Sequence, residues 1–469
     1  MTTLRAAAHW ARPWTAPPRW GGQVKLVDGR VSEVVEASPE GDSVLIPGLV
    51  NAHDHGRGVR SLSFGASDEP LEAWLWGLRR GPMTDPYLTA LVAFGRMALS
   101  GVTTVVHNHL PQSDDWLGEA KAVARAARDV GVRLGFVVPI LDQNLAGYDG
   151  GAAVKSAISG KHWNSIEATM GQRPFAEQID LVTEIGAAID GPSVVTQYGP
   201  PGPQWLSRSG FAAVGEAADA QTRRVHVHLL ETRLQRDWMD TACPAGAHTF
   251  FDRIGLLNDR LTIAHGVFLR DAELAAFRRA GVTLALNTSS NLRLFSGTAD
   301  GAALRASGIF LGIGLDGMAF DDDDDILREL RLAATVLGPR GPDPAGLARA
   351  DVLRAAYSGG WRAYNGTVGE GIVAGAEADM VALSLSAVAG DRIDGAPETL
   401  GDMITGRATK AAVTDVWVAG RRIVKGGALT GVDLKGAEKA LSRAARATFD
   451  PPNWVSPARV ATARESRRG

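Results

Sequence analysis

Cysteine is almost absent from this sequence of 469 residues. The single cysteine, Cys243, excludes an internal disulfide framework and any cysteine-rich zinc site. A metal bound by this chain must therefore be held by histidine and carboxylate side chains.

An excess of charge and a long apolar run are also lacking. The chain has 49 basic and 52 acidic residues, a formal charge of −3, so no strong field attracts nucleic acid or anionic lipid. No window approaches the roughly 18 uncharged apolar residues of a membrane span, and the N-terminus lacks the basic-then-apolar order of a signal peptide. We expect a soluble, cytoplasmic protein without a nucleic-acid or membrane partner.

Eight short apolar runs rich in β-branched residues alternate with segments of helical periodicity. The runs are Leu45 to Ala52, Val102 to His107, Val132 to Leu141, Val194 to Tyr198, Val225 to Leu230, Leu261 to Val267, Val282 to Asn287 and Ile309 to Leu315. This alternation implies parallel strands buried on both faces, and it predicts an α/β fold, a closed (β/α)8 TIM-type barrel. The rival, an open doubly wound sheet, normally has a Gly-rich dinucleotide turn after its first strand, and none is found.

The two flanks carry short strand-like pieces punctuated by Gly and Asp, and they predict a small β-sandwich domain built from both ends of the chain. We expect residues 1–48 and 367–430 to form this domain and residues 49–366 to form the barrel. Residues 431–469 are expected to form a C-terminal helix followed by a disordered, Arg-rich tail.

Two histidines follow the first apolar run. Side chains two positions apart on a strand share a face, so His53 and His55 both point into the barrel mouth, where barrels of this type place their chemistry. Two imidazoles facing one point suit one cation. The alternative is a pair of hydrogen-bonded core histidines.

The fifth run ends in a similar pattern. His226 and His228 share a face, and His228 lies nearer the strand end, which makes it the better metal ligand. His226 lies deeper, with a hydrogen-bonding role. Glu231 follows where the strand turns over the metal, at a place from which it can transfer protons.

Two further polar residues close later runs. His265 ends the sixth run, and Asp316 ends the eighth. A carboxylate after an apolar strand is costly to bury unless a cation or hydrogen bonds compensate it, and a metal would do so.

These stretches, taken in order, resemble the amidohydrolase superfamily, and within it the branch of triazine hydrolases and purine- or nucleoside-type aminohydrolases. The matching stretches are Pro-Gly-Leu-Val-Asn-Ala-His-Asp-His at 47–55, His-Leu-Leu-Glu-Thr at 228–232, Ala-His-Gly at 264–266, Ser-Asn-Leu-Arg-Leu at 290–294, Asp-Gly at 316–317, and the C-terminal segments at 375–383 and 416–424.

The resemblance implies one divalent metal, Zn²⁺ by preference or Fe²⁺, since both accept imidazole and carboxylate. The implied ligands are His53, His55, His228 and Asp316, with Glu231, His265 and Asp316 as catalytic residues. The bound cation lowers the pKa of its water from about 15.7 towards roughly 7, and the resulting hydroxide attacks an electrophilic ring carbon.

Substrate contacts are harder to assign. Many members of this branch carry a Pro-His-Ala motif after the fourth strand, but Pro201 stands at the histidine position here, so the substrate of adenosine-type members does not transfer. Tyr198, Gln204 and Trp205 are candidate contacts, although loop packing explains each equally well.

Four more side chains near the ends of the early strands are candidates. His107 and His109 end the second run, and either contact substrate or lie behind the site. Trp76, with Trp74, is a candidate aromatic lid over a flat heterocycle, the alternative being a helix packed on the barrel rim. Arg57 is a candidate pocket or scaffold residue, and the acidic run Asp321 to Asp325 is read as the start of a helix.

The function predicted from these features is hydrolytic deamination of an amino-substituted nitrogen heterocycle, a small-molecule substrate. The alternatives are displacement of an amine or chloride from a triazine, opening of a cyclic amide, or a non-catalytic barrel scaffold. A homo-oligomer, a dimer or tetramer, is expected from the family resemblance.

Overall fold

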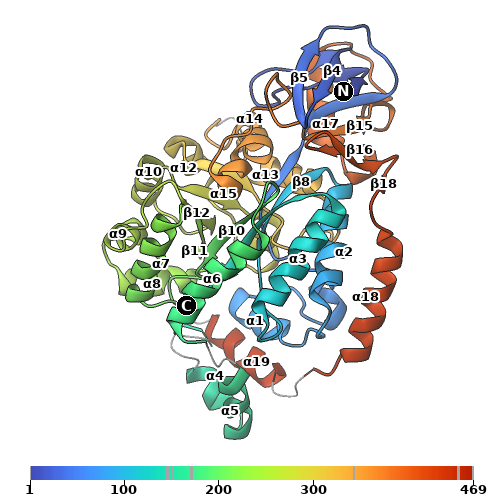
Figure 1. Cartoon of the computed structure of the whole chain (residues 1–469). Coiled ribbons are helices and arrows are strands. Elements are labelled where there is room, and N and C mark those ends of the chain that lie inside the picture. The colour runs from blue at the N-terminus through green and yellow to red at the C-terminus, as the bar shows by residue number, and fades with distance from the viewer. Residues whose placement is uncertain are drawn as a thin grey trace.

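The computed structural model describes residues 2–143, 147–148, 152–169, 173–341, 344–451 and 455–466. Its centre is a closed barrel in which each strand pairs in parallel with its sequence neighbours and the last strand pairs with the first (Figure 1). The strands are β7 (Leu49–Asp54), β8 (Val102–Asn108), β9 (Arg133–Pro139), β10 (Val194–Gly199), β11 (Val225–Leu229), β12 (Leu261–His265), β13 (Thr283–Leu286) and β14 (Phe310–Ile313). The predicted (β/α)8 TIM-type barrel is confirmed.

Helices connect the barrel strands and surround them. Those between β7 and β10 are η1 (Ser61–Phe64), α1 (Leu71–Leu78), α2 (Pro86–Leu99), α3 (Trp116–Val130), α4 (Ala152–Ala157), α5 (Gly160–Thr169) and α6 (Phe175–Ile189). Those after β10 are α7 (Arg208–Ala220), α8 (Arg233–Ala242), α9 (Ala247–Arg253), α10 (Asp271–Ala280), α11 (Thr288–Arg293), α12 (Gly301–Ser307), α13 (Ile326–Val336), α14 (Arg349–Arg354), the π-helix η2 (Ala355–Gly359) and α15 (Gly360–Asn365).

Helix ends follow local sequence signals. Asp325, the last acid of the run at 321–325, is the N-cap of α13, and its carboxylate accepts from the backbone N–H groups of Leu327 and Arg328. The acidic run is therefore a helix start, as predicted. Gly131 and Gly281 end α3 and α10 in the left-handed conformation, which glycine adopts without steric cost.

The small β domain has two sheets that pack face to face at one end of the barrel (Figure 1). One sheet contains β1 (Thr2–Arg5), β4 (Gln23–Val27) and β5 (Arg30–Val35). The other contains β2 (Ala8–His9), β3 (Arg19–Trp20), β6 (Ser43–Pro47), β15 (Met380–Ser384), β16 (Val413–Val418), β17 (Arg421–Lys425) and β18 (Ala428–Leu429). Both flanks of the chain contribute strands, so the predicted sandwich is confirmed. The helices α16 (Leu385–Ala389), α17 (Pro397–Arg407) and η3 (Lys410–Ala412) connect its later strands.

The first apolar run is not one strand, contrary to expectation. It is divided at Gly48 between β6, which pairs with β15 in the sandwich, and β7, which belongs to the barrel. A Cβ atom at position 48 would lie 2.5 Å from the side chain of Thr103, so only glycine fits this close crossing. The exact domain boundaries stay a prediction.

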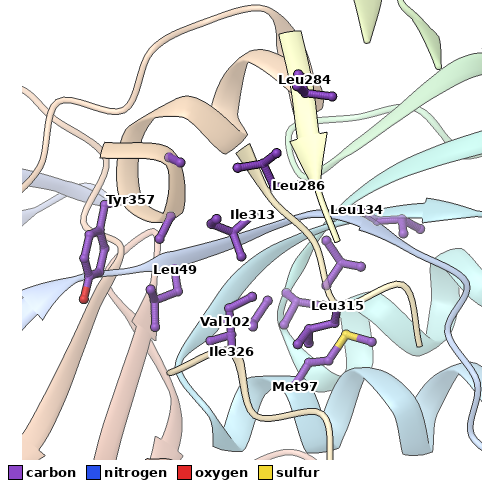
Figure 2. Close-up of a cluster of buried hydrophobic side chains, with 14 of the residues drawn as sticks. Leu49, Met97, Val102, Leu134, Leu284, Leu286, Ile313, Leu315, Ile326 and Tyr357 are labelled. Atoms are coloured by element: carbon purple, nitrogen blue, oxygen red, sulfur yellow. The ribbon is translucent and has the colours of Figure 1, made fainter. Parts of the chain in front are cut away.

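The core has an outer and an inner part. Apolar side chains on the outside of the strands pack against the helices, as Figure 2 shows for Leu49, Val102, Leu134 and Ile313. Inside the barrel, Tyr364 of α15 packs with small and β-branched residues of the strands. Arg133, the first residue of β9, lies over Trp361 of the same helix and donates to Asp379 and Glu377 at 3.0 and 2.7 Å. The amino-terminal end of the barrel is thus filled and tied to the sandwich.

The C-terminal segment forms two helices, α18 (Leu434–Thr448) along the barrel and α19 (Val455–Ser466) against α1 (Figure 1). The expectation of a disordered tail is therefore wrong for residues 455–466, because Val455 and Ala458 are buried against Trp76 and Trp163. Among the described residues, no helix is both long and apolar enough to cross a membrane.

Candidate metal centre

The carboxyl ends of three barrel strands bring the predicted metal ligands together. His53 lies in β7 and His55 directly follows it, His228 lies in β11, and Asp316 follows β14. One oxygen of Asp316, Oδ1, lies 3.3 Å from the Nε2 atoms of both His53 and His55. The Nε2 atom of His228 lies 3.3 Å from that of His55.

These distances match the edges of a metal tetrahedron. Ligand atoms about 2.0–2.1 Å from one cation in tetrahedral geometry are about 3.3–3.4 Å apart. The three imidazoles offer ligand atoms within 4.8 Å of one another. The Nε2 atom of His53 is buried without a hydrogen-bond partner, which is costly unless another group compensates it. The arrangement therefore fits a divalent metal.

The far ring nitrogens are held by hydrogen bonds. Nδ1 of His55 lies 2.9 Å from the backbone oxygen of Asn108, which can only accept, so Nδ1 carries the proton and Nε2 is free for a metal. Nδ1 of His53 lies 2.9 Å from Nε2 of His226 and 2.9 Å from the side-chain amide of Asn108. Partners of this kind orient ligating imidazoles. His226 thus lies behind a predicted ligand, as expected.

Burial and charge set the protonation states that metal binding requires. Burial lowers the pKa of His53 and of His228 well below the ordinary value, so both imidazoles are neutral. Burial opposes ionisation of Asp316, but its contacts with His53 and His55 prevail and hold the pKa of the carboxyl well below its usual range. The site combines neutral imidazoles with one carboxylate.

Hydrogen bonds fasten the Asp316 loop to β7. The side chain of Asn51 accepts from the N–H of Leu315 at 3.0 Å and donates to Asp54 at 2.8 Å. Asp54 accepts from the N–H of Gly317 at 3.1 Å, and the N–H of Asp316 itself donates to the backbone oxygen of His53. The carboxylate is therefore fixed relative to the two histidines on the neighbouring strand.

His265 and Asp316 share an unusual backbone conformation. Both have positive φ, 73° and 59°, and both precede a glycine with positive φ. A non-glycine residue in this region is strained, and such strain clusters at functional sites. The turn aims Nε2 of His265 towards Oδ2 of Asp316, 4.0 Å away, while its Nδ1 lies 2.9 Å from Oδ1 of Asn291.

Glu231 lies beside this group, and its surroundings favour the protonated form of its carboxyl. Its Oε2 atom is 3.5 Å from Nε2 of His265, and its Oε1 atom is buried without a hydrogen-bond partner. Burial, followed by the negative charges of Asp316 and Glu72, raises the pKa of Glu231 well above its usual value. A buried, protonated carboxyl next to a metal site is suited to general acid catalysis.

The two histidines of β8 belong to a different network. Nε2 of His107 lies 3.3 Å from Nδ1 of His109, whose Nε2 lies 2.8 Å from the Glu119 carboxylate on α3. Glu119 also accepts from the hydroxyl of Ser113 at 2.6 Å. These contacts lead away from the metal ligands, so the predicted substrate contacts of His107 and His109 gain no support from the geometry.

The candidates after β10 lie apart from the ligands as well. Tyr198 is fully buried in the core between strands and helices. Gln204 accepts from Gln235 at 2.8 Å, and Gln235 in turn accepts from the N–H of Glu231, so Gln204 acts on the site through two hydrogen bonds. The backbone oxygen of Trp205 accepts hydrogen bonds from the N–H groups of Asp142 and Gln143, in the segment that follows β9.

The two tryptophans of α1 have different surroundings. Trp76 packs with Val154, Trp163 and Val455, away from the metal ligands. Trp74 packs with Leu294 and Met318, which lie in the loops after β13 and β14. Of the two, Trp74 is therefore the one placed at the barrel mouth.

Sequence reasoning missed three residues that order the centre. Asn51 and Asn108 fix β7 and its histidines, and the hydroxyl of Ser290 donates to Oδ2 of Asp316 at 2.5 Å. Asn51 is two positions before His53 and Asn108 lies between two histidines, so their place at strand ends was the available signal.

A comparison with known families identifies the group to which this chain is related. The model of the amidohydrolase family matches residues 44–423, most of the chain. The chain belongs to the amidohydrolase family. The resemblance inferred from the sequence motifs is thereby confirmed.

Individual relatives agree with this membership. The chain is 28% identical over 298 residues to 5-methylthioadenosine/S-adenosylhomocysteine deaminase of Desulfitobacterium hafniense (strain Y51), a match that covers 62% of this chain and 61% of that relative. A zinc-bound adenosine deaminase structure from Xanthomonas campestris is 26% identical with a TM-score of 0.79, covering 95% of this chain and 98% of that one.

A triazine hydrolase shares the same fold. A mutant atrazine chlorohydrolase from Arthrobacter aurescens TC1, complexed with zinc and atraton, is 20% identical with a TM-score of 0.80, covering 95% of this chain and all of that chain. At this identity the likeness shows the fold alone. Zinc in the Xanthomonas structure, together with the His and Asp cluster described above, supports a divalent metal.

Proposed function

We propose that this protein catalyses hydrolytic deamination of an amino-substituted nitrogen heterocycle by means of one metal-activated water. The observation that carries the proposal is the meeting of His53, His55, His228 and Asp316 at tetrahedral-edge distances, with the protonated Glu231 close by. Deaminase relatives at 26–28% identity support the choice of reaction.

The residues divide the work as follows. His53, His55, His228 and Asp316 would hold the cation, which supplies an activated water when bound. Asp316 and His265, 4.0 Å apart, accept the proton of that water. Glu231 donates its proton to a ring nitrogen, which makes the adjacent carbon more electrophilic. The Glu231 carboxylate that results then takes the proton that remains on the added oxygen and passes it to the leaving amino group, so that ammonia departs and a carbonyl remains.

Zinc is the proposed metal, with Fe²⁺ as the alternative. The donor set of neutral imidazoles and one carboxylate suits either ion, and the zinc in the two neighbouring structures favours zinc. Metal analysis of protein purified without added metal would distinguish them. A cytoplasmic location and a dimer or tetramer, both expected from the sequence, stay predictions.

The test combines metal analysis with an assay for ammonia. Purified protein is expected to contain about one divalent metal per chain and to release ammonia from at least one member of a panel of amino-purines, amino-pyrimidines, amino-triazines and pterins. His228→Ala should lose metal and turnover together. His248→Ala, a histidine on α9 outside the site, is the matched control and should retain both.

Other outcomes would change the assignment. Release of chloride or an alkylamine, or opening of a cyclic amide, without any ammonia would replace the deaminase by another hydrolase that uses the same centre. Turnover that survives in His228→Ala would reject the metal site itself. Metal-loaded protein that is inactive on every compound of the panel would point to a scaffold.

A further inference from the structure

Arg57 lies beside the metal centre and forms no ion pair with any acidic residue that the structure describes. Its aliphatic stem packs so closely on Gly317 that a Cβ atom there would lie 3.0 Å from its Cγ, and Gly317 directly follows Asp316. The guanidinium carbon lies 4.9 Å from the ring centre of Trp74. In the described part of the chain, Nε of Arg57 is buried without a hydrogen-bond partner.

The neighbouring carboxylates are already engaged. Asp54 accepts from Asn51 and from the N–H groups of Gly56 and Gly317. Asp316 faces the histidines with one oxygen and accepts from Ser290 with the other. Across the ranges that the structure covers, neither approaches Arg57 within the 4.0 Å of an ion pair.

A second arginine in the same region, Arg293, has a positive charge that acidic side chains of the protein compensate. Arg293 is buried, pairs with Asp68 at 2.9 Å and Asp322 at 3.4 Å, and donates to the backbone oxygen of Ala319 at 2.9 Å. Arg57 is half-buried and its Nε atom is fully buried. Because a charge taken out of water without such partners is costly, the isolation of Arg57 favours an acceptor from outside the chain.

The side chain that stacks on Arg57 also offers an unused donor. Nε1 of Trp74 is buried and has no hydrogen-bond partner among the described residues. Buried polar groups of this kind are rare in native proteins unless a ligand or water meets them. Arg57 and Trp74 thus place two such donors next to each other, and one of the two is cationic. An oxygen atom of a ligand is the matching acceptor.

We propose that Arg57, fixed by Trp74 and Gly317, binds an oxygen atom of the substrate, so that the substrate is an amino-heterocycle carrying an oxo or carboxylate group rather than an adenine-type ring. This inference rests on the proposed deaminase function and narrows its substrate class. A planar guanidinium binds such oxygens with two parallel, charge-assisted hydrogen bonds. The presence of Pro201 in place of the motif histidine agrees with a substrate unlike adenosine.

The test uses pairs of substrates that differ in the oxygen. Guanine is compared with 2-aminopurine, cytosine with 4-aminopyrimidine, and 4-aminopyrimidine with its 5-carboxylate, with adenine as an additional oxygen-free ring, for wild type, Arg57→Met and Arg57→Lys. We expect Arg57→Met to lower kcat/KM for the oxygenated rings by about 10- to 150-fold, and for the others by less than about threefold. Arg57→Lys should restore part of the loss, because it keeps the charge but not the fork. Comparing the loss for the oxo rings with the loss for the 5-carboxylate shows which of the two kinds of oxygen Arg57 binds.

Arg79→Met is the matched control, because Arg79 stacks on Trp76 at 5.3 Å on the same helix but outside the site. It should leave the ratio between paired substrates unchanged. Metal content and Tm of every variant separate misfolding from lost recognition. Calorimetry with the unreactive ring 4-pyrimidinone, compared with pyrimidine, adds a binding measurement that does not depend on turnover, and Arg57→Met should weaken only the former.

The results separate the two proposals. Equal losses for both members of each pair, or a wild-type preference for adenine and 4-aminopyrimidine, would overturn the role of Arg57 and leave the deaminase standing. No ammonia from any ring, together with Arg57-dependent binding of 4-pyrimidinone, would reject the deaminase and support the oxygen site.

Discussion

The barrel mouth has two halves that use similar residues in opposite ways. On β7, β11, β12 and β14 or just after them, histidines and an aspartate face one another, and Nε2 of His53 has no hydrogen-bond partner among the described residues. On β8, the pair His107 and His109 is connected to Glu119 on a surrounding helix. Both halves place histidines at the carboxyl ends of parallel strands.

The difference shows that position on a barrel is necessary for a catalytic role but does not suffice. What distinguishes the first half is that its polar atoms converge on one point. In the second half, the ring of His109 is held by a carboxylate of the protein itself. Perturbed protonation occurs in both, since burial lowers the pKa of His107 as well as that of His228.

The largest expected effect tests the converging half directly. Asp316→Asn keeps the shape of the side chain but removes the charge that faces His53 and His55. We expect turnover to fall by about 10³-fold or more, because a metal ligand and a proton acceptor are lost together. Turnover and metal content would be measured on the same sample. Activity within tenfold of wild type would remove Asp316 from the chemistry and break the contrast.

A smaller loss is expected at Glu231. Glu231→Gln preserves size but cannot donate a proton, so turnover should fall by about 10²- to 10⁴-fold with metal content unchanged. Because the pKa of Glu231 is raised well above its usual value, the wild-type carboxyl keeps its proton to higher pH than an ordinary glutamic acid does. Its activity should then decline on the alkaline side, as pH passes through that raised pKa, and Glu231→Gln should lose this limb of the pH profile. An unchanged alkaline limb would assign it to another group.

A substitution in the other half of the barrel mouth, at the end of β8, should change the stability of the protein rather than its catalytic activity. His109→Phe removes the 2.8 Å contact with Glu119 and leaves a buried carboxylate without one of its partners. We expect the free energy of unfolding to fall by about 1–3 kcal/mol and kcat/KM to change by less than about threefold. Glu119→Gln, measured by the same denaturant titration, is the companion variant. A tenfold loss of kcat/KM with metal retained would bring β8 into the active site.

Much of the converging half follows from the sequence, for a physical reason. Alternation along a strand fixes that His53 and His55 share a face, and parallel strands in a barrel bring their carboxyl ends to one rim. The topology therefore joins His228 and Asp316 to them although 88 positions separate the latter two in the chain. The amidohydrolase motifs pointed to the same residues.

The rest depends on contacts that no local pattern encodes. Both faces of a barrel strand are apolar, so nothing in the run at 194–198 shows that Tyr198 packs into the core. The different surroundings of Trp74 and Trp76 depend in part on α19, which lies more than 370 positions later. The split of the first run at Gly48 similarly requires pairing of β6 with β15, far away in the chain.

The smallest expected effect concerns Glu329, a carboxyl that lies behind the half of the barrel mouth with the predicted metal ligands. Glu329 on α13 accepts from the N–H of Ser289 at 3.0 Å and from its hydroxyl, behind the loop that carries Ser290. Burial raises the pKa of Glu329 from an ordinary value near 4.5 to about 7. Because the folded state holds this proton more tightly than the unfolded state does, the protein loses stability as pH rises from about 4.5 through about 7.

Glu329→Gln removes this titration, so between pH 5 and pH 8 wild type should lose about 1–2 kcal/mol of unfolding free energy relative to the variant. Urea titrations of both proteins at the two pH values measure the difference, and kcat should be unaffected because the carboxyl faces a helix rather than the metal ligands. Parallel pH dependences would show that Glu329 is ionised in the folded state throughout. A loss of kcat would instead show that a strongly shifted carboxyl next to the site takes part in the chemistry, and convergence on one point would no longer be what separates catalytic from structural groups.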